Sequence, residues 1–207
     1  LMAMMLTPVL KAFGYEFNTV SIWCTQYNRS LSTALVMLGI LLIVLGVAHD
    51  ENAVTNYRNL LKRPGNPVDD FLLLDGIGAV AINTGVNIIL ATIVVLAIGG
   101  DINGPTIGGI LTIAGFSVKG KHARNILPVM LGIILSGLMR GGGAVVTPAA
   151  QLALLFGTTL APISGTYGFP AGIVAGFIHS CVVLYAGAGY SGVNLYNNGF
   201  AGGLVAI

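Results

Sequence analysis

A run of 18 residues without a charge, 31–48, is the feature that most limits how this chain can fold. An apolar run of that length predicts a helix that crosses the hydrocarbon core of a bilayer. The runs 71–99 and 168–188 predict two further spans. Charged residues make up 8 % of the chain, whereas soluble domains carry about 25 %. We therefore expect an integral membrane protein.

The apolar region 126–156 contains a stretch that a continuous membrane helix should not hold. Arg140 is followed by three glycines, 141–143, and then by Thr147 and Pro148. The glycines free the backbone, while Pro148 suits a first helical position with Thr147 as the cap before it. We expect one helix to end near Arg140 and a short one to begin at Pro148. We expect this break to lie within the membrane, where irregular backbone is tolerated if it is buried in protein or lines a watery cavity. The alternative is an ordinary polar turn between two spans, outside the membrane.

The fold predicted from these patterns is an all-α, polytopic transmembrane helix bundle with discontinuous or re-entrant helices. Residues 106–118 form a short apolar segment, residues 157–167 are loop-like, and an irregular polar stretch at 189–200 leads into a resumed helix. The apolar ends of the chain, 1–4 and 204–207, resemble each other. This likeness predicts that 1–207 is a single transmembrane domain, a fragment of a longer chain and one unit of a repeated architecture.

Residues 49–70 are the long polar stretch of the chain and are predicted to form a cytoplasmic loop with a surface helix. The stretch carries a basic cluster at 58–63, and a second basic cluster follows at 119–124. The positive-inside rule predicts that both clusters are cytoplasmic. That needs an even number of crossings between them, which 71–99 and 106–118 supply.

Three motifs in the second half of the chain carry a resemblance to a known family. They are GF at 115–116 with GKH at 120–122 and NILP at 125–128, GFPAG at 168–172 with AGFIH at 175–179, and NLYNNGFAGG at 194–203. The combination resembles a bacterial family of multi-spanning membrane proteins known mainly as a domain of unknown function. The resemblance implies a multi-pass protein of the bacterial inner membrane with a repeated architecture, and it implies no activity or site residues.

A fold-level likeness to the urea-channel class rests on two turns. An asparagine-bearing turn enters a span at 26–31, and Asn197-Asn198-Gly199 precedes a later half-helix. Arg29 stands where that class usually has a proline, so the likeness implies only a similar use of broken helices.

Polar side chains inside or beside the apolar segments are the candidates for binding a solute. They offer amide, hydroxyl, imidazole or guanidinium groups to a small polar molecule. The candidates are Asn83, Asn87, Arg140, Thr147, Gln151, His179, Asn194, Asn197 and Asn198.

Each candidate for solute binding also has a structural interpretation. Asn83 and Asn87 share one helical face with Asp75 and line a path or make interhelical hydrogen bonds. Arg140 holds an anionic or carbonyl-bearing solute, pairs with Asp75 or Asp101, or caps helix carbonyls.

The candidates nearer the C-terminus have the same two interpretations. Thr147 and Gln151 lie at the N-terminus of the short helix, whose free N–H groups would bind a solute together with them. Alternatively, Thr147 only caps the helix and Gln151 bonds a neighbouring segment. His179 is a proton relay or gate, or a buried histidine bonded to a neighbouring helix. The three asparagines at 194–198 suit a neutral polar solute or a surface turn.

The function predicted from these residues is a transporter or channel for a small polar solute. The solute is expected near the broken ends at 141–148 and 194–199, facing Asn83 and Asn87. One alternative is a membrane-embedded enzyme acting on lipid head groups, in which Asp69, Asp70 and Asp75 hold a divalent metal. The other is a structural subunit without a solute path.

Several classes of function are not supported by the sequence. The chain has no common catalytic motif, and its two cysteines have no metal-ligand spacing, so no catalytic residue, metal site or cofactor is predicted. A net charge of +2 is too small to imply nucleic acid. The expected partners are the lipid bilayer, the solute, and a second copy in a homo-oligomer. The ridge Gly168, Gly172 and Gly176 would pack within one chain or between copies.

Overall fold

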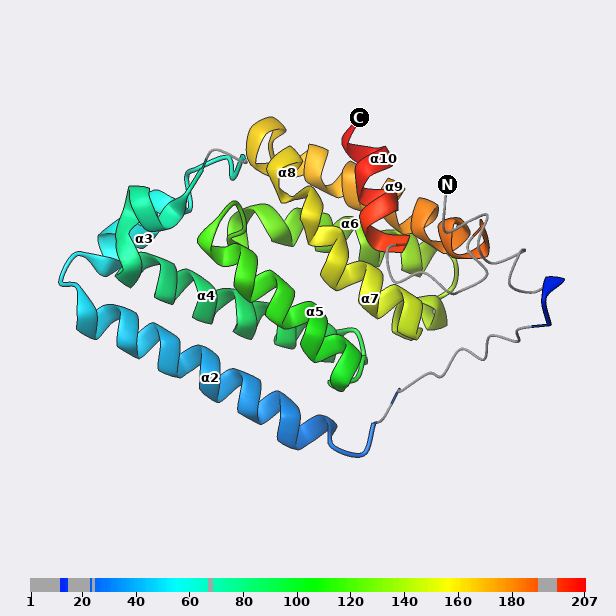
Figure 1. Ribbon diagram of the computed structural model, residues 1–207, viewed down its shortest axis with the longest axis horizontal. Helices are drawn as coiled ribbons and strands as arrows, with labels where there is room; N and C mark the ends of the chain where they lie inside the picture. The colour runs from blue at the N-terminus through cyan, green and yellow to red at the C-terminus, as the bar shows by residue number, and fades with distance from the viewer. Residues whose placement is uncertain (1–11, 15–22, 24, 67–68, 190–196) are drawn as a thin grey trace.

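The computed structural model describes residues 12–14, 23, 25–66, 69–189 and 197–207 as a bundle of helices (Figure 1). These residues contain no β-strand, which confirms the all-α class. The α-helices are α2 (Asn28–His49), α3 (Ala53–Leu60), α4 (Phe71–Ala97), α5 (Gly104–Gly115), α6 (Ala123–Met139), α7 (Pro148–Phe156), α8 (Ala161–Tyr167), α9 (Phe169–Gly189) and α10 (Asn197–Ala206). The 3-10 helices are η1 (Phe116–Val118), η2 (Gly142–Val146) and η3 (Gly157–Leu160).

The three predicted spans all form helices. By length and composition, α2, α4 and most of α9 are long and apolar enough to cross a membrane. The outer face of α2 exposes large apolar side chains such as Met37, Leu41 and Val44, as a helix facing lipid would.

Close glycine contacts hold α2 against α4. The two helices run antiparallel, because Gly39 meets Gly85 while Gly46 meets Gly78. A Cβ atom added to Gly46 would lie 2.6 Å from the Gly78 carbonyl oxygen, and one added to Gly39 would lie 2.8 Å from that of Gly85. Glycine at these positions lets the two backbones approach, which is how apolar helices gain packing energy inside a membrane.

A second glycine contact joins α6 to α9. Gly132 of α6 lies against the Ile173 carbonyl, and Gly176 of α9 lies against that of Val129. A Cβ atom added to Gly172 would lie 2.8 Å from Pro128 Cβ. Gly172 and Gly176 of the predicted ridge therefore pack within the chain.

The predicted helix break is present. Helix α6 ends at Met139, the 3-10 helix η2 follows, and α7 begins at Pro148. Thr147 is the N-cap of α7, and its Oγ1 accepts a hydrogen bond of 3.3 Å from the Ala150 N–H. The local chemistry of the Thr-Pro step sets this boundary.

The prediction of a loop at 157–167 is wrong, because η3 and α8 continue the helical course there. Packing against other segments overrides the weak helix propensity of this glycine- and threonine-containing stretch. Gly157 and Thr158 are buried, and Gly165 lies against the Pro64 carbonyl.

Helix α4 and its neighbours set the geometry of the polar end of the bundle. Gly76 leaves helical geometry, with φ 84° and ψ 164°, and kinks α4 one turn after its start. Helix α5 runs back beside α4 from the opposite end (Figure 1) and has only 12 residues, about 18 Å. In the polar stretch 49–70, α3 buries Ala53 and Leu60.

Substituting Gly85 with alanine should lower the thermal unfolding midpoint of the purified protein. The added methyl group meets the Gly39 carbonyl and pushes α2 from α4, at a cost of about 1–3 kcal/mol. Gly108→Ala is the matched control, because no atom lies within 4 Å of its added Cβ atom. That change should be neutral or stabilising by up to about 1 kcal/mol. Equal midpoints for the two variants would show that the α2–α4 contact does not need glycine.

Candidate solute site at the basic end of the bundle

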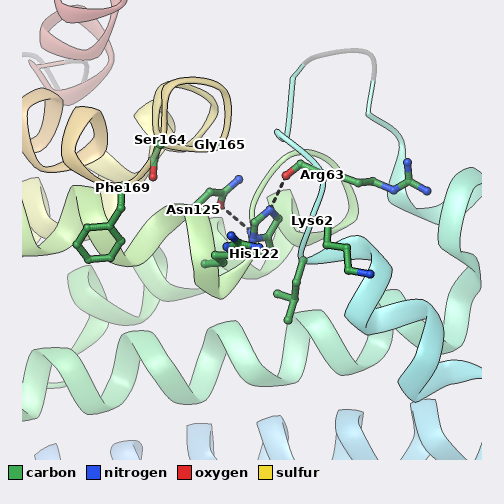
Figure 2. Close-up of a pocket in the computed structure, with 10 residues that line it drawn as sticks. Lys62, Arg63, His122, Asn125, Ser164, Gly165 and Phe169 are labelled. Carbon is green, nitrogen blue, oxygen red and sulfur yellow. Dashed lines mark hydrogen bonds between the residues drawn. The ribbon is translucent and has the colours of Figure 1, made fainter.

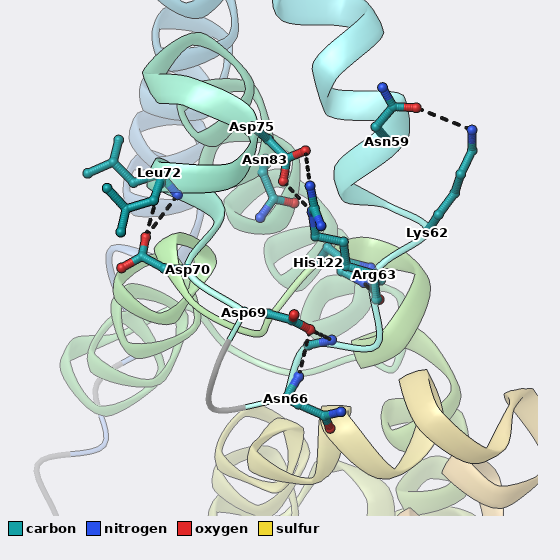
Figure 3. Close-up of polar contacts among 12 residues, drawn as sticks. Asn59, Lys62, Arg63, Asn66, Asp69, Asp70, Leu72, Asp75, Asn83 and His122 are labelled. Atoms are coloured by element: carbon teal, nitrogen blue, oxygen red, sulfur yellow. Dashed lines mark hydrogen bonds and ion pairs between the residues drawn. The ribbon is translucent and has the colours of Figure 1, made fainter.

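Two loops meet at one end of the bundle (Figure 3). The first loop comprises residues 61–66 and 69–70, between α3 and α4, and the second comprises residues 119–122, between η1 and α6. An isolated β-bridge joins Asp70 to Lys119, and the backbones of Gly65 and Gly120 touch. The two basic clusters of the sequence therefore lie together, and we call this part of the molecule the basic end.

Asn83 and Asn87 anchor the second loop from the middle of α4. Asn83 Nδ2 donates to the carbonyls of Ser117 at 2.9 Å and Lys121 at 2.8 Å. Asn87 Nδ2 donates to Ser117 Oγ at 2.7 Å and to the Lys121 carbonyl at 3.2 Å. Both asparagines are fully buried, so the polar face of α4 is covered by this loop.

Asn125 completes the anchoring of the second loop from the first turn of α6. Its Nδ2 donates to the Gly120 carbonyl at 2.7 Å, and its Oδ1 accepts from the His122 N–H at 3.0 Å. Gly120 has a φ of +85°, which favours glycine. The GKH motif therefore forms a turn, and the side chain of Asn125 holds that turn by hydrogen bonds to its backbone.

A partly buried ion pair ties the first loop to the kink of α4. Arg63 Nε and Nη2 lie 2.6 Å and 2.9 Å from the two carboxylate oxygens of Asp75, whose side chain is 3 % exposed. The hydrogen bond to Asp75 raises the pKa of Arg63. The two parallel hydrogen bonds neutralise the Asp75 carboxylate and also fix the orientation of the Arg63 side chain.

His122 links the two loops (Figure 2). Its Nε2 lies 2.9 Å from the Arg63 carbonyl, and because a carbonyl only accepts, Nε2 carries the proton. Burial lowers the pKa of His122, which favours the neutral ring. Its Nδ1 is buried without a hydrogen-bond partner among the described residues.

The three aspartates of the basic end have separate partners. Asp69 accepts from the Gly65 and Asn66 N–H groups at 2.8 Å and 3.0 Å. Asp70 caps the start of α4 and lies 3.4 Å from Lys119 Nζ, while Asp75 binds Arg63. In the part of the chain that the structure describes, no three side chains of His, Cys, Asp or Glu gather to hold a metal ion.

Lys121 is a buried cation without a carboxylate. It is 6 % exposed, its Nζ donates to Thr158 Oγ1 at 3.0 Å, and the ammonium lies 5.0 Å from the centroid of the Phe116 ring. Among the described residues, no carboxylate oxygen lies within 4.0 Å of it. Burial lowers the pKa of Lys121, which lies in the loop outside the spanning helices, to about 8.

Two cavities border the second loop. The Lys121 cavity, of about 330 Å³, is lined by Gly65, Asn66, Phe116, Lys119, Gly120, Lys121, Thr159 and Pro162. The His122 cavity, of about 260 Å³ (Figure 2), is lined by Leu61, Lys62, Arg63, His122, Arg124, Asn125, Ser164, Gly165, Gly168 and Phe169. Neither lining includes a carboxylate, and both include cationic residues.

The candidates beside the helix break lie at the other end of α4. Gln151 is fully buried, its Oε1 accepts from the Asp101 N–H at 2.9 Å, and its Nε2 donates to the Val146 carbonyl at 2.7 Å. Arg140 Nη2 donates to Ser180 Oγ at 2.8 Å, and no ion pair links Arg140 to a described acidic residue. These groups hold neighbouring segments together.

The remaining candidates lie between α9 and α10. His179 is fully buried, and its Nε2 lies 3.4 Å from Asn198 Oδ1. Asn197 Oδ1 is buried without a partner among the described residues. Asn194 lies outside the described residues.

In the part of the chain that the structure describes, Asn83 and Asn87 face η1 and the second loop rather than the break at 141–148. Gln151 lies against Gly100, just beyond the C-terminal end of α4. The central residues of the basic end, Lys121 and His122, were not among the predicted site residues. The GKH motif marked them as a family feature, but their burial depends on contacts with α4 and η3 that no local pattern contains.

Removing Arg63 from its ion pair with the buried Asp75 carboxylate should destabilise the protein. Arg63→Met leaves the Asp75 carboxylate buried without its partner, at a cost of about 3 kcal/mol. Asp75→Asn added to that variant should recover part of the loss in thermal unfolding midpoint. Lys119→Met, which breaks an exposed pair, is the control and should cost under about 1 kcal/mol. An unchanged midpoint for Arg63→Met would exclude a stabilising role for the pair.

Alkaline pH should relieve the cost of burying Lys121. Below about pH 8 the lysine is charged in the folded and the unfolded chain, so the full cost, about 3 kcal/mol, is present. Between about pH 8 and pH 10.5 the folded chain loses the proton first, so stability rises with pH. The difference in unfolding midpoint between Lys121→Met and wild type should shrink over that range. Burial raises the pKa of Tyr57, which could also make stability depend on pH in this range. Because Tyr57 is present in both proteins, its effect cancels in the difference between Lys121→Met and wild type. A difference in unfolding midpoint that stays constant from about pH 8 to pH 10.5 would contradict the lowered pKa of Lys121.

Comparison with known proteins places the chain in a family. The family described as protein of unknown function (DUF1576) matches residues 49–207, which include the basic end and both cavities. No curated protein and no solved structure matched the chain. The likeness to urea channels therefore stays a prediction. Since the match covers more than half of the 207 residues, the chain belongs to the DUF1576 family.

Proposed function

We propose that this protein is a membrane transporter or channel for a small polar solute, with the solute path at the basic end. The observation that carries the proposal is the second loop. It is non-helical backbone, it is anchored to the middle of α4 by Asn83 and Asn87, and it borders two cavities.

The length of α5 supports a broken helix at this point. Its 12 residues extend about 18 Å, less than the hydrocarbon core of about 30 Å. The chain then leaves helical geometry at the second loop before α6 begins. Backbone of this kind is tolerated within a bilayer where it is buried in protein or lines a water-filled cavity, and transporters build solute sites from such helix ends.

The size of the cavities points to a small solute. A volume of about 330 Å³ lies at the small end of the range for ligand pockets, about 300–1,000 Å³. The Lys119 side chain in the lining of this cavity is 61 % exposed, so the cavity is open to water.

The orientation and location belong to the same proposal. Lysine and arginine gather at the basic end, and the positive-inside rule makes that end cytoplasmic. The solute then enters from the cytoplasm, in the inner membrane of a bacterial cell, and the second loop lies between it and the opposite end of the bundle.

One observation favours a second candidate, a membrane subunit without a solute path. The amide nitrogens of Asn83 and Asn87 are fully used in holding the second loop, which is what a purely structural role requires. The aspartates suggested for a lipid-head-group enzyme each have another partner, so that alternative has less support.

Solute flux into proteoliposomes tests the transporter proposal. The wild type should move one class from a panel of amides, polyols, amines and small carboxylates faster than protein-free vesicles. Asn66→Trp fills the Lys121 cavity and should return that flux to the protein-free rate. Asn59→Trp is the control, because Asn59 is exposed on α3 and lines neither cavity.

The outcomes separate the two candidates. Flux that Asn66→Trp leaves unchanged would contradict a path through this cavity. If folded wild type moves no solute, either passively or under a proton or sodium gradient, the transporter proposal fails and the structural subunit is favoured.

A further inference from the structure

We infer that the Lys121 cavity is an anion site, in which the Lys121 ammonium binds a carboxylate or phosphate group. This inference rests on the proposed function in so far as it names the class of solute, a small oxyanion. As a binding site it stands on the surroundings of Lys121 alone.

Among the described residues, the charge of Lys121 has no counter-ion. The ammonium is 6 % exposed, and its partners are one hydroxyl group, Thr158 Oγ1, and the face of the Phe116 ring. Buried charges in proteins are otherwise paired or bound to a ligand, because an isolated ion loses its hydration without compensation. An ammonium has three donors, and one of them is used by a side chain that the structure describes.

The acidic residues nearby are engaged elsewhere. Asp69 accepts two backbone N–H groups of the first loop, and Asp75 is held by Arg63. Asp70 caps α4 and meets Lys119 at 3.4 Å. The Lys121 cavity therefore has two ammonium groups in its lining and no carboxylate.

The side chain of Lys121 is separable from the anchoring of its loop. Asn83 and Asn87 bind the Lys121 backbone carbonyl, and Asn125 binds that of Gly120. A substitution at position 121 keeps these hydrogen bonds. The ammonium group is therefore not needed for the turn, and its position beside a cavity of about 330 Å³ is explained by a ligand.

Carboxylate and phosphate groups share the chemistry that this site offers. Both present oxygen acceptors and negative charge to an ammonium group. Such a group is carried by a small soluble anion or by the head group of an anionic lipid, since the cavity lies at an end of the bundle where both are accessible.

Acetate and acetamide form the matched pair of probes, because they have similar shapes and differ in charge. Thermal unfolding of the purified protein is measured at pH 7 in chloride-free buffer against increasing acetate, acetamide or inorganic phosphate. Acetate or phosphate should raise the wild-type midpoint in a saturable way, and acetamide should not. Lys121→Met should abolish the response, and Lys121→Arg should keep part of it.

Arg58→Met is the control variant, because Arg58 is an exposed cation on α3 that lines neither cavity. It should respond to the anions like the wild type. An equal response to acetamide, or an unchanged anion response in Lys121→Met, would overturn the inference. So would the absence of any anion response in wild-type protein held in nanodiscs of phosphatidylcholine alone.

Nanodiscs containing phosphatidylglycerol distinguish the two sources of the anion. A wild-type midpoint that rises with this lipid, and then no longer responds to acetate, supports the anion site and assigns it to a lipid head group. An acetate response that persists supports the site and assigns it to a soluble anion.

The flux assay separates this inference from the proposed function. Anion binding without flux of any solute would support the site and contradict transport. Flux of a neutral solute, with no anion binding, would support transport and contradict the site.

Discussion

The hydrogen bonds from Asn83 and Asn87 to the second loop are the interaction on which the basic end depends. A loop that is buried against the middle of a helix must satisfy its carbonyls with donors from the protein, because water does not reach them. The two amide groups supply the carbonyls of Ser117 and Lys121 with donors, and they lie one helical turn apart. Without them these carbonyls would be buried without hydrogen-bond donors where the chain turns between α5 and α6.

The glycine contacts make that loop possible by fixing α4 and α6 in place. Gly78 and Gly85 hold α4 against α2, and Gly132 holds α6 against α9. Because packing is the main source of helix association in lipid, each pair needs a close backbone approach to stay in register. The second loop connects the two pairs of helices, because Asn83 and Asn87 of α4 hold it on one side. On the other side Asn125 of α6 donates to the Gly120 carbonyl.

Sequence patterns were sufficient where structure is local. The three long apolar helices and the start of α7 at Pro148 follow from apolar run length and cap chemistry, and the structure has both. The helical course at 157–167 was missed because glycine and threonine there are buried by distant segments. The polar face of α4 was predicted to line a solute path or to hydrogen-bond a neighbouring helix, and Asn83 and Asn87 hydrogen-bond the chain between α5 and α6. The sequence could not show that its partner is the carbonyl of Lys121, 38 residues away from Asn83.

The backbone carbonyl of Lys121 is held by α4, while its side chain carries a positive charge. Having both in one residue restricts where the charge can move. The Lys121 carbonyl is fixed by α4, so the ammonium group has a limited reach and lies against η3. A ligand that neutralises the ammonium would act on the same short segment that the asparagines hold. Binding in the Lys121 cavity would thus act directly on the junction of α5 and α6. In a transporter this is the place at which solute binding would bias one arrangement of the bundle over another.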